Sequence, residues 1–192
     1  MSNIKIEYMR EYGSGKVFVE TGTYLGDTVQ IALDAGYDLV HSIEVDQEMF
    51  DHCQNRFKDN PKVKLWFGDS VDIVPNIVDE LNGPATFWLD AHASGPLRGG
   101  RYAPCPLVLE LQAIYGKEVV NITENGMQKQ RKKSSIDNHT IMIDDRRLFG
   151  SAEWGYVQEN RIMELLFAIN PNYKIKYLDG HQANDIICAT VR

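Results

Sequence analysis

The sequence contains no apolar run long enough to cross a lipid bilayer. A membrane-spanning helix needs roughly 20 consecutive apolar residues, and no segment of the 192-residue chain reaches that length. The first ten residues also lack the apolar core of a secretion signal. The sequence therefore predicts a cytoplasmic protein without a membrane partner.

Cysteine is scarce, and its spacing excludes the common cysteine-based sites. The three cysteines, Cys53, Cys105 and Cys188, are odd in number and form no Cys-x-x-Cys pair. Zinc sites and redox pairs use closely spaced cysteines. We therefore expect reduced, mostly buried thiols, which also fits a cytoplasmic protein.

Positive charge is in deficit. The chain has 20 Lys and Arg against 27 Asp and Glu, for a net charge of -7, which argues against general binding to nucleic acid or to anionic membranes. The basic run Lys129–Lys133 lies within the polar stretch 118–138. We interpret that stretch as a solvated insertion in a single domain that spans residues 1–192.

Short β-prone runs alternate with segments of helical periodicity. Because only residues 179–185 separate the last two runs, they form a hairpin and not a parallel crossover. We expect Asp46 and Ser70 to cap two of the helices. The pattern predicts an α/β fold, namely a three-layer Rossmann-like sandwich whose seven-stranded, mostly parallel sheet has one antiparallel strand from the C-terminal hairpin. The expected strands are Val17–Val19, Leu39–Val45, Val63–Phe67, Ala85–Leu89, Thr140–Ile143, Tyr173–Leu178 and Ile186–Val191.

The first strand leads into a glycine-containing turn with the spacing Glu-x-Gly-x-x-x-Gly, from Glu20 to Gly26. Gly22 allows a tight turn and close approach of a ligand, and Gly26 lies at a helix start, where free N–H groups favour an anionic group. The spacing differs from the Gly-x-Gly-x-x-Gly of dinucleotide-binding proteins, which argues against a nicotinamide oxidoreductase. The two glycines could also serve only for close packing.

Acidic residues end the next two strands. Glu44 could accept hydrogen bonds from both hydroxyls of a ribose, and Asp69 could accept one from the amino group of adenine. Asp69 could equally be an ordinary helix cap. Ligands bind beyond the carboxyl ends of strands in such sheets, and the three corners together favour an adenosine-containing cofactor.

These residues resemble the class I S-adenosylmethionine-dependent methyltransferases over nearly the whole chain. The resemblance implies that Glu20 and Gly22 line the methionine part of the cofactor, that Thr28 meets its carboxylate, and that Tyr24 lies near the sulfonium. The cofactor-binding residues that it implies are Glu20, Thr21, Gly22, Thr23, Tyr24, Gly26, Thr28, Glu44, Asp69, Ser70 and Asp90.

Three further carboxylates follow the fourth and fifth strands, which should be neighbours. Asp90, Asp144 and Asp145 would repel one another unless a cation lies between them, and Mg²⁺ or a similar divalent ion prefers oxygen ligands. The nearby His92 is a candidate general base because its ordinary pKa suits proton transfer, and it could equally be a metal ligand or a structural residue. The two adjacent aspartates could alternatively pair with Arg146 or Arg147.

This second pattern resembles the metal-dependent O-methyltransferases of the macrocin and catechol types, with Asp90 and His92 as catalytic residues. The chain departs from the catechol type, which has a lysine where Ala93 stands and extra helices before the first strand, where this chain has about 16 residues. The acceptor would be a small-molecule hydroxyl, with a sugar as one candidate. We expect either loop 94–106, which contains Arg98 and Arg101, or a second subunit of a homo-oligomer to cover the bound acceptor.

Two other functions remain open. One is a metal-free methyltransferase that acts on nitrogen, although the Asn/Asp-Pro-Pro-aromatic motif of nucleic-acid N-methyltransferases is missing after the fourth strand. The other is a non-catalytic partner subunit that binds S-adenosylmethionine, against which the intact acidic cluster argues.

Overall fold

The computed structural model describes residues 3–92, 100–101, 104–116 and 138–192. Most of the predicted insertion lies outside these residues, including the basic run Lys129–Lys133, and so does Arg98. No helix of the described part is long and apolar enough to cross a membrane.

The described residues form a seven-stranded sheet with the strand order β3-β2-β1-β4-β5-β7-β6. Strand β7 runs antiparallel to both of its neighbours, and the other pairings are parallel. The predicted sheet with one antiparallel strand is therefore confirmed. The strands are β1 (Val17–Thr21), β2 (Leu39–Glu44), β3 (Val63–Phe67), β4 (Ala85–Leu89), β5 (Thr140–Ile143), β6 (Lys174–Leu178) and β7 (Ile186–Thr190).

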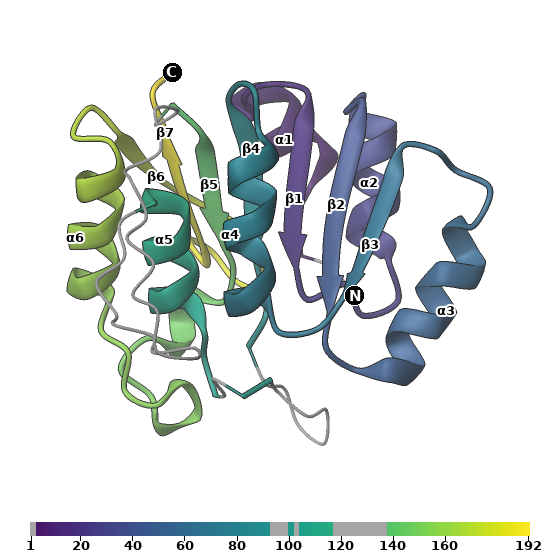
Figure 1. Ribbon diagram of the computed structural model, residues 1–192. Helices are drawn as coiled ribbons and strands as arrows, with labels where there is room; N and C mark the ends of the chain where they lie inside the picture. Colours follow the sequence, from purple (N-terminus) through teal and green to yellow (C-terminus); the bar gives the residue numbers. More distant parts are fainter. Residues whose placement is uncertain (1–2, 93–99, 102–103, 117–137) are drawn as a thin grey trace, which may run out of the picture.

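Helices cover both faces of the sheet, with α4, α5 and α6 in front of it in Figure 1 and α1 and α2 behind. Each face has its own apolar core, because consecutive strand residues point to opposite sides. Phe87 of β4 packs with α4 to α6, whereas the adjacent Trp88 packs with α1 to α3. The three-layer sandwich is thus confirmed. The helices are α1 (Ile6–Tyr12), α2 (Asp27–Ala35), α3 (Gln47–Phe57), α4 (Ser70–Glu80), α5 (Leu107–Tyr115) and α6 (Glu159–Ile169).

Two local details differ from the sequence prediction. The short helix α1 precedes β1 and buries Met9, but seven residues offer too little periodicity to predict it. Helix α4 is capped by Asp69 and not by Ser70, because Asp69 Oδ1 accepts a hydrogen bond from the backbone N–H of Val71 at 3.0 Å. The predicted Asp46 cap of α3 is confirmed by its bonds from two backbone N–H groups.

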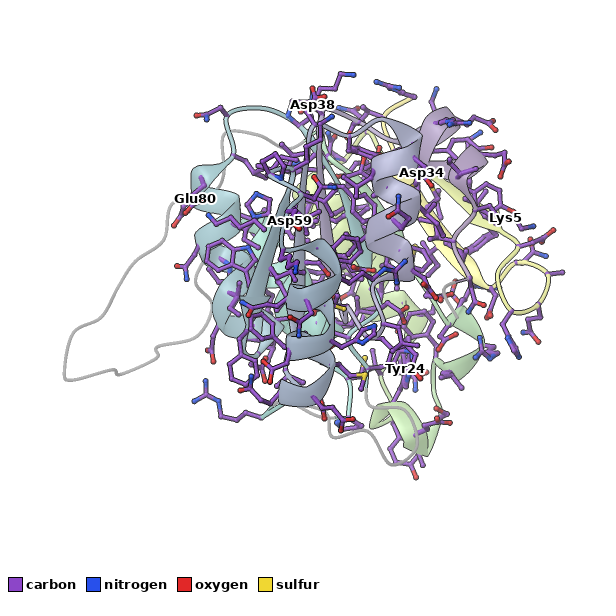
Figure 2. The ribbon with its side chains drawn as sticks, turned by 90° about the vertical axis from the view of Figure 1, so that its right-hand side faces the viewer. Lys5, Tyr24, Asp34, Asp38, Asp59 and Glu80 are labelled. Carbon is purple, nitrogen blue, oxygen red and sulfur yellow. The ribbon has the colours of Figure 1, made fainter. Side chains whose placement is uncertain are left out.

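The carboxyl ends of the parallel strands gather at one edge of the sheet. Figure 2 shows Tyr24, which follows β1, at the opposite end of the molecule from Asp38, which precedes β2. Because β7 is antiparallel, its first residues reach the same edge as the last residues of β5. Every candidate site residue after a strand therefore belongs to one region.

Candidate functional site

The turn after β1 brings the ends of β1 and β4 close together. Gly22 has a φ of +85°, and a Cβ atom there would lie 2.7 Å from the backbone oxygen of Asp90. Gly26 has a φ of +82°, and its Cβ would lie 2.6 Å from the Phe57 ring of α3. The close approach of two strands thus requires glycine at position 22. At position 26 the positive φ and the contact with α3 both favour glycine, so close packing, which the sequence left open as an alternative, accounts for part of the pattern.

Glu20 lies below this turn and is 1% exposed. The Ser42 hydroxyl donates to Glu20 Oε2 at 2.5 Å and lies 2.6 Å from the Thr23 hydroxyl. Thr28 also hydrogen-bonds to the Glu20 carboxyl. Burial raises the pKa of Glu20 to about 8, so Glu20 is largely protonated at neutral pH. These side chains form a buried network that supports the turn.

Glu44, at the end of β2, is held by the backbone of two loops. Its Oε2 accepts a hydrogen bond from the N–H of Tyr24 at 2.7 Å, and its Oε1 accepts from Val45 and Asp46 at 2.9 and 2.8 Å. Oε2, which accepts only one of these bonds, has a lone pair left for a further donor. Tyr24 has a φ of +50°, a conformation that is costly for a bulky residue and is often found at functional sites.

Asp69, at the start of α4, has one satisfied and one unsatisfied oxygen. Oδ1 caps the helix, whereas the buried Oδ2 has no hydrogen-bond partner within the described part of the chain. A Cβ atom on Gly100 would lie 2.1 Å from Oδ2, so a larger residue at this position would require the Asp69 side chain to shift. Asp69 is therefore a helix cap with a free acceptor atom, which combines the two interpretations that the sequence left open.

Glu110, a buried carboxylate in α5, is a site residue that the sequence pattern did not predict. Its side chain is paired with the hydroxyls of Thr21 and Ser70, and burial, with the nearby charges of Asp69 and Asp90, raises its pKa to about 7. Thr21 and Ser70, both predicted to bind cofactor, thus turn their hydroxyls toward α5. The available signal was a charged residue on the apolar face of a helix, since its neighbours on that face are buried. These neighbours are Leu107, Leu111 and Ile114.

His92 lies between two carboxylates at the ends of β4 and β5. Its Nε2 is 3.2 Å from Asp90 Oδ1 and 2.6 Å from Asp145 Oδ2. Burial lowers the pKa of His92, but the hydrogen bonds and charges of Asp145 and Asp90 outweigh that effect and raise the pKa to about 10. In this arrangement His92 is a cation at neutral pH, and it must lose its proton to another group before it can act as a general base.

The three aspartates that we predicted to hold a metal are divided between two groups. Asp90, His92 and Asp145 place ligand atoms within 4.8 Å of one another, and so do Asp144, Asp145 and Asp185. Both oxygens of Asp144 have protein donors: Oδ1 accepts from the Asp145 N–H at 2.8 Å and Oδ2 from Asn3 at 3.1 Å. Asp145 belongs to both groups and has a φ of +56°.

Arg147 already provides a positive charge for the second group. Its guanidinium donates to Asp145 Oδ1 at 2.5 Å and also to the fully buried Asp185. The alternative pairing of Asp145 with an arginine is therefore confirmed for Arg147, whereas Arg146 pairs with Glu159 at 3.0 Å. The sequence pattern did not single out Asp185. The predicted antiparallel hairpin nevertheless implied that the residues at the start of its second strand, which Asp185 directly precedes, reach this edge of the sheet.

Aromatic rings line the region beside His92. The Trp154 ring lies 5.2 Å from the His92 ring, and the Phe149 ring lies 5.1 Å from that of Trp154. Trp154 is 2% exposed, and its indole N–H has no hydrogen-bond partner in the described part of the chain. The reaction end of the site thus has an apolar wall next to its charged groups.

Comparison with known proteins shows that several solved structures, most of them methyltransferases, share this fold. No protein-family model and no curated protein sequence matches the chain. A Clostridium thermocellum protein assigned as an rRNA methylase has a TM-score of 0.62 and 12% identity over 96% of this chain and 94% of its own. An O-methyltransferase from Bacillus cereus, in complex with S-adenosylhomocysteine, has a TM-score of 0.58 and 14% identity over 96% and 78%.

A spermidine synthase from Thermotoga maritima is also similar, with a TM-score of 0.57 and 11% identity over 96% of this chain. This chain spans 56% of the length of that enzyme. The names of the neighbours thus cover different activities. At these identities the likeness establishes the shared fold alone.

Proposed function

We propose that the protein is an S-adenosylmethionine-dependent methyltransferase. The observation that carries the proposal is the order of three corners at one sheet edge: the tight turn at Gly22, the backbone-held carboxylate of Glu44 and the unsatisfied oxygen of Asp69. These corners correspond in order to three parts of the cofactor. The glycine turn would face the methionine part, Glu44 would accept from the ribose, and Asp69 would accept from the amino group of adenine. The S-adenosylhomocysteine bound to similar structures supports the assignment.

The chain's own residues would bind and orient the reactants, since the cofactor carries the methyl group. Glu44 would accept a hydrogen bond from a ribose hydroxyl at Oε2, while three N–H groups hold its carboxylate in place. Tyr24, 44% exposed, lies above the turn after β1. The Glu20 network keeps that turn in place, which restricts the position of the methionine part. Alignment of the two reactants is a large part of the catalysis of a displacement reaction.

We further propose that the acceptor is a small-molecule hydroxyl and that a divalent cation assists the transfer. The supporting observation is the group of Asp90, His92 and Asp145, whose two carboxylates and imidazole suit such an ion. A bound cation would lower the pKa of an acceptor hydroxyl and stabilise the resulting alkoxide. The ligand set is thus revised from the sequence prediction, with His92 in place of Asp144. A sugar hydroxyl, self-association, the single-domain organisation and the cytoplasmic location remain predictions.

Metal-free transfer to nitrogen or oxygen is the second candidate, and a specific observation favours it. The His92 imidazolium and the Arg147 guanidinium already lie against Asp90 and Asp145, so the carboxylates have positive partners without a metal. In that case Asp90 would accept a hydrogen bond from the N–H or O–H of the acceptor and orient it toward the cofactor.

Calorimetric titration with S-adenosylhomocysteine tests the main proposal, with NAD as the control ligand. We expect micromolar binding of the first and none of the second. A Glu44→Gln variant should bind at least about tenfold more weakly, which is the loss expected for charge-assisted hydrogen bonds. The exposed Glu48→Gln on α3 is the matched control. Absence of binding to folded wild-type protein would overturn the proposal.

Titration with Mn²⁺ and Mg²⁺ separates the two candidate mechanisms. Metal-assisted transfer predicts saturable metal binding that Asp145→Asn removes and the exposed control Asp27→Asn keeps, together with turnover that a chelator abolishes. Metal-free transfer predicts no site-specific binding and turnover that a chelator leaves unchanged.

A further inference from the structure

Glu110 is anchored on one side and unpaired on the other. The hydroxyls of Thr21 and Ser70 hold its carboxyl group, and Thr21 Oγ1 in turn accepts the N–H of Asp90 at 3.2 Å. Glu110 Oε1, however, has no hydrogen-bond partner in the described part of the chain, although the residue is 1% exposed. Because an unpaired buried acceptor is costly in a native fold, this atom points to a donor that a ligand supplies.

A second unpaired acceptor lies beside it. Asp69 Oδ2 is buried without a partner, and Asp69 directly precedes Ser70, which contacts Glu110. The charge of Asp69 contributes to the raised pKa of Glu110, which also indicates that the two carboxyl groups are close. The two side chains with unpaired acceptor oxygens therefore both lie near the start of α4.

The chemistry of this pair favours an amino group over a metal ion. Among the described residues, the two carboxylates belong to no group of three ligands that lie close enough to hold an ion. A neutral amino group offers two N–H donors and leaves the site without an added charge. The position after β3 is also the purine end of the cofactor site proposed above.

We propose that Glu110 is a purine-binding residue, whose Oε1 accepts one hydrogen of the exocyclic amino group of adenine while Asp69 Oδ2 accepts the other. This inference rests on the proposed S-adenosylmethionine site and adds to it a residue from α5. Through its contacts with Thr21 and Ser70, Glu110 would at the same time fix the end of β1 against the start of α4. Thr21 in turn binds the backbone of Asp90, which follows β4.

The test compares S-adenosylhomocysteine with S-inosylhomocysteine, in which an oxo group replaces the amino group. Calorimetry on the wild-type protein at pH 8, above the pKa of about 7 of Glu110, should show a preference for the adenosyl compound of about tenfold or more, because an oxygen would face two unpaired acceptors unless Glu110 takes up a proton. In Glu110→Gln, an amide N–H can face that oxygen, so the preference should fall at least about tenfold. The exposed Glu164→Gln on α6 is the control and should keep the wild-type preference.

The ratio of the two affinities separates a purine contact from a structural role, which would weaken both ligands equally. Circular dichroism and the thermal midpoint establish that each variant is folded, and the wild-type ratio tests the inference without any variant. A wild-type protein that binds both compounds equally, or a Glu110→Gln protein that keeps the wild-type ratio, overturns the inference and leaves the cofactor proposal intact. If neither compound binds the wild-type protein, both proposals fail.

Discussion

Replacing Glu20 with glutamine should change how the stability of the protein depends on pH. Burial raises the pKa of Glu20 from 4.5 to about 8, because a charge is less stable inside the fold than in water. The folded state therefore holds a proton that the unfolded chain releases between these two pH values. The free energy of unfolding should fall across that range, by at most about 1.4 kcal/mol per pH unit for this group.

Glutamine keeps the shape of Glu20 and can still accept a hydrogen bond from Ser42, but it cannot ionise. At pH 5 we expect Glu20→Gln to be less stable than wild type by about 1 kcal/mol, the contribution of one hydrogen bond. At pH 8.5 it should be more stable by about 2–3 kcal/mol, because wild type then carries a buried charge. The raised pKa of Glu110 acts in the same direction in both proteins and cancels in the difference.

Urea denaturation of the two proteins from pH 5 to pH 9 measures this crossover, with the exposed Glu164→Gln as the control. The free energy of unfolding of the control should follow that of wild type at every pH. A difference between Glu20→Gln and wild type that stays constant with pH would refute the reasoning, since it would show that Glu20 is already ionised in the folded protein.

Three further results are expected. Gly22→Ala should lower the free energy of unfolding by about 1–3 kcal/mol, because its φ is +85° and its Cβ would lie 2.7 Å from the Asp90 oxygen. The same variant should abolish S-adenosylhomocysteine binding in calorimetry, and unchanged binding would contradict the role of this turn. Arg147→Ala leaves the fully buried Asp185 without its cation, so urea denaturation should show a loss of about 3 kcal/mol, and an unchanged midpoint would refute the pairing. His92→Asn should reduce methyl transfer at least about 100-fold while S-adenosylhomocysteine affinity stays within about threefold, whereas equal losses in both would place His92 in cofactor binding.

Local patterns in the sequence were sufficient for most of the fold. The runs Val63–Phe67, Ala85–Leu89 and Thr140–Ile143 are strands with the predicted bounds, because each is a short apolar run between turn residues. The seven-residue loop between the last two strands was enough to predict the antiparallel hairpin. The cap of α4 was misplaced by one residue, since Asp69 and Ser70 are both good capping residues and only the backbone geometry distinguishes them.

The sequence by itself determined which chemical groups reach the carboxyl edge of the sheet, because strand direction follows from connectivity. Only the tertiary structure decided which of these groups meet. Asp145 contacts His92 and Arg147 rather than joining Asp90 and Asp144 around one centre, and Glu110 reaches the site from α5. Such contacts depend on side-chain directions and backbone angles of residues far apart in the chain, which no local pattern encodes.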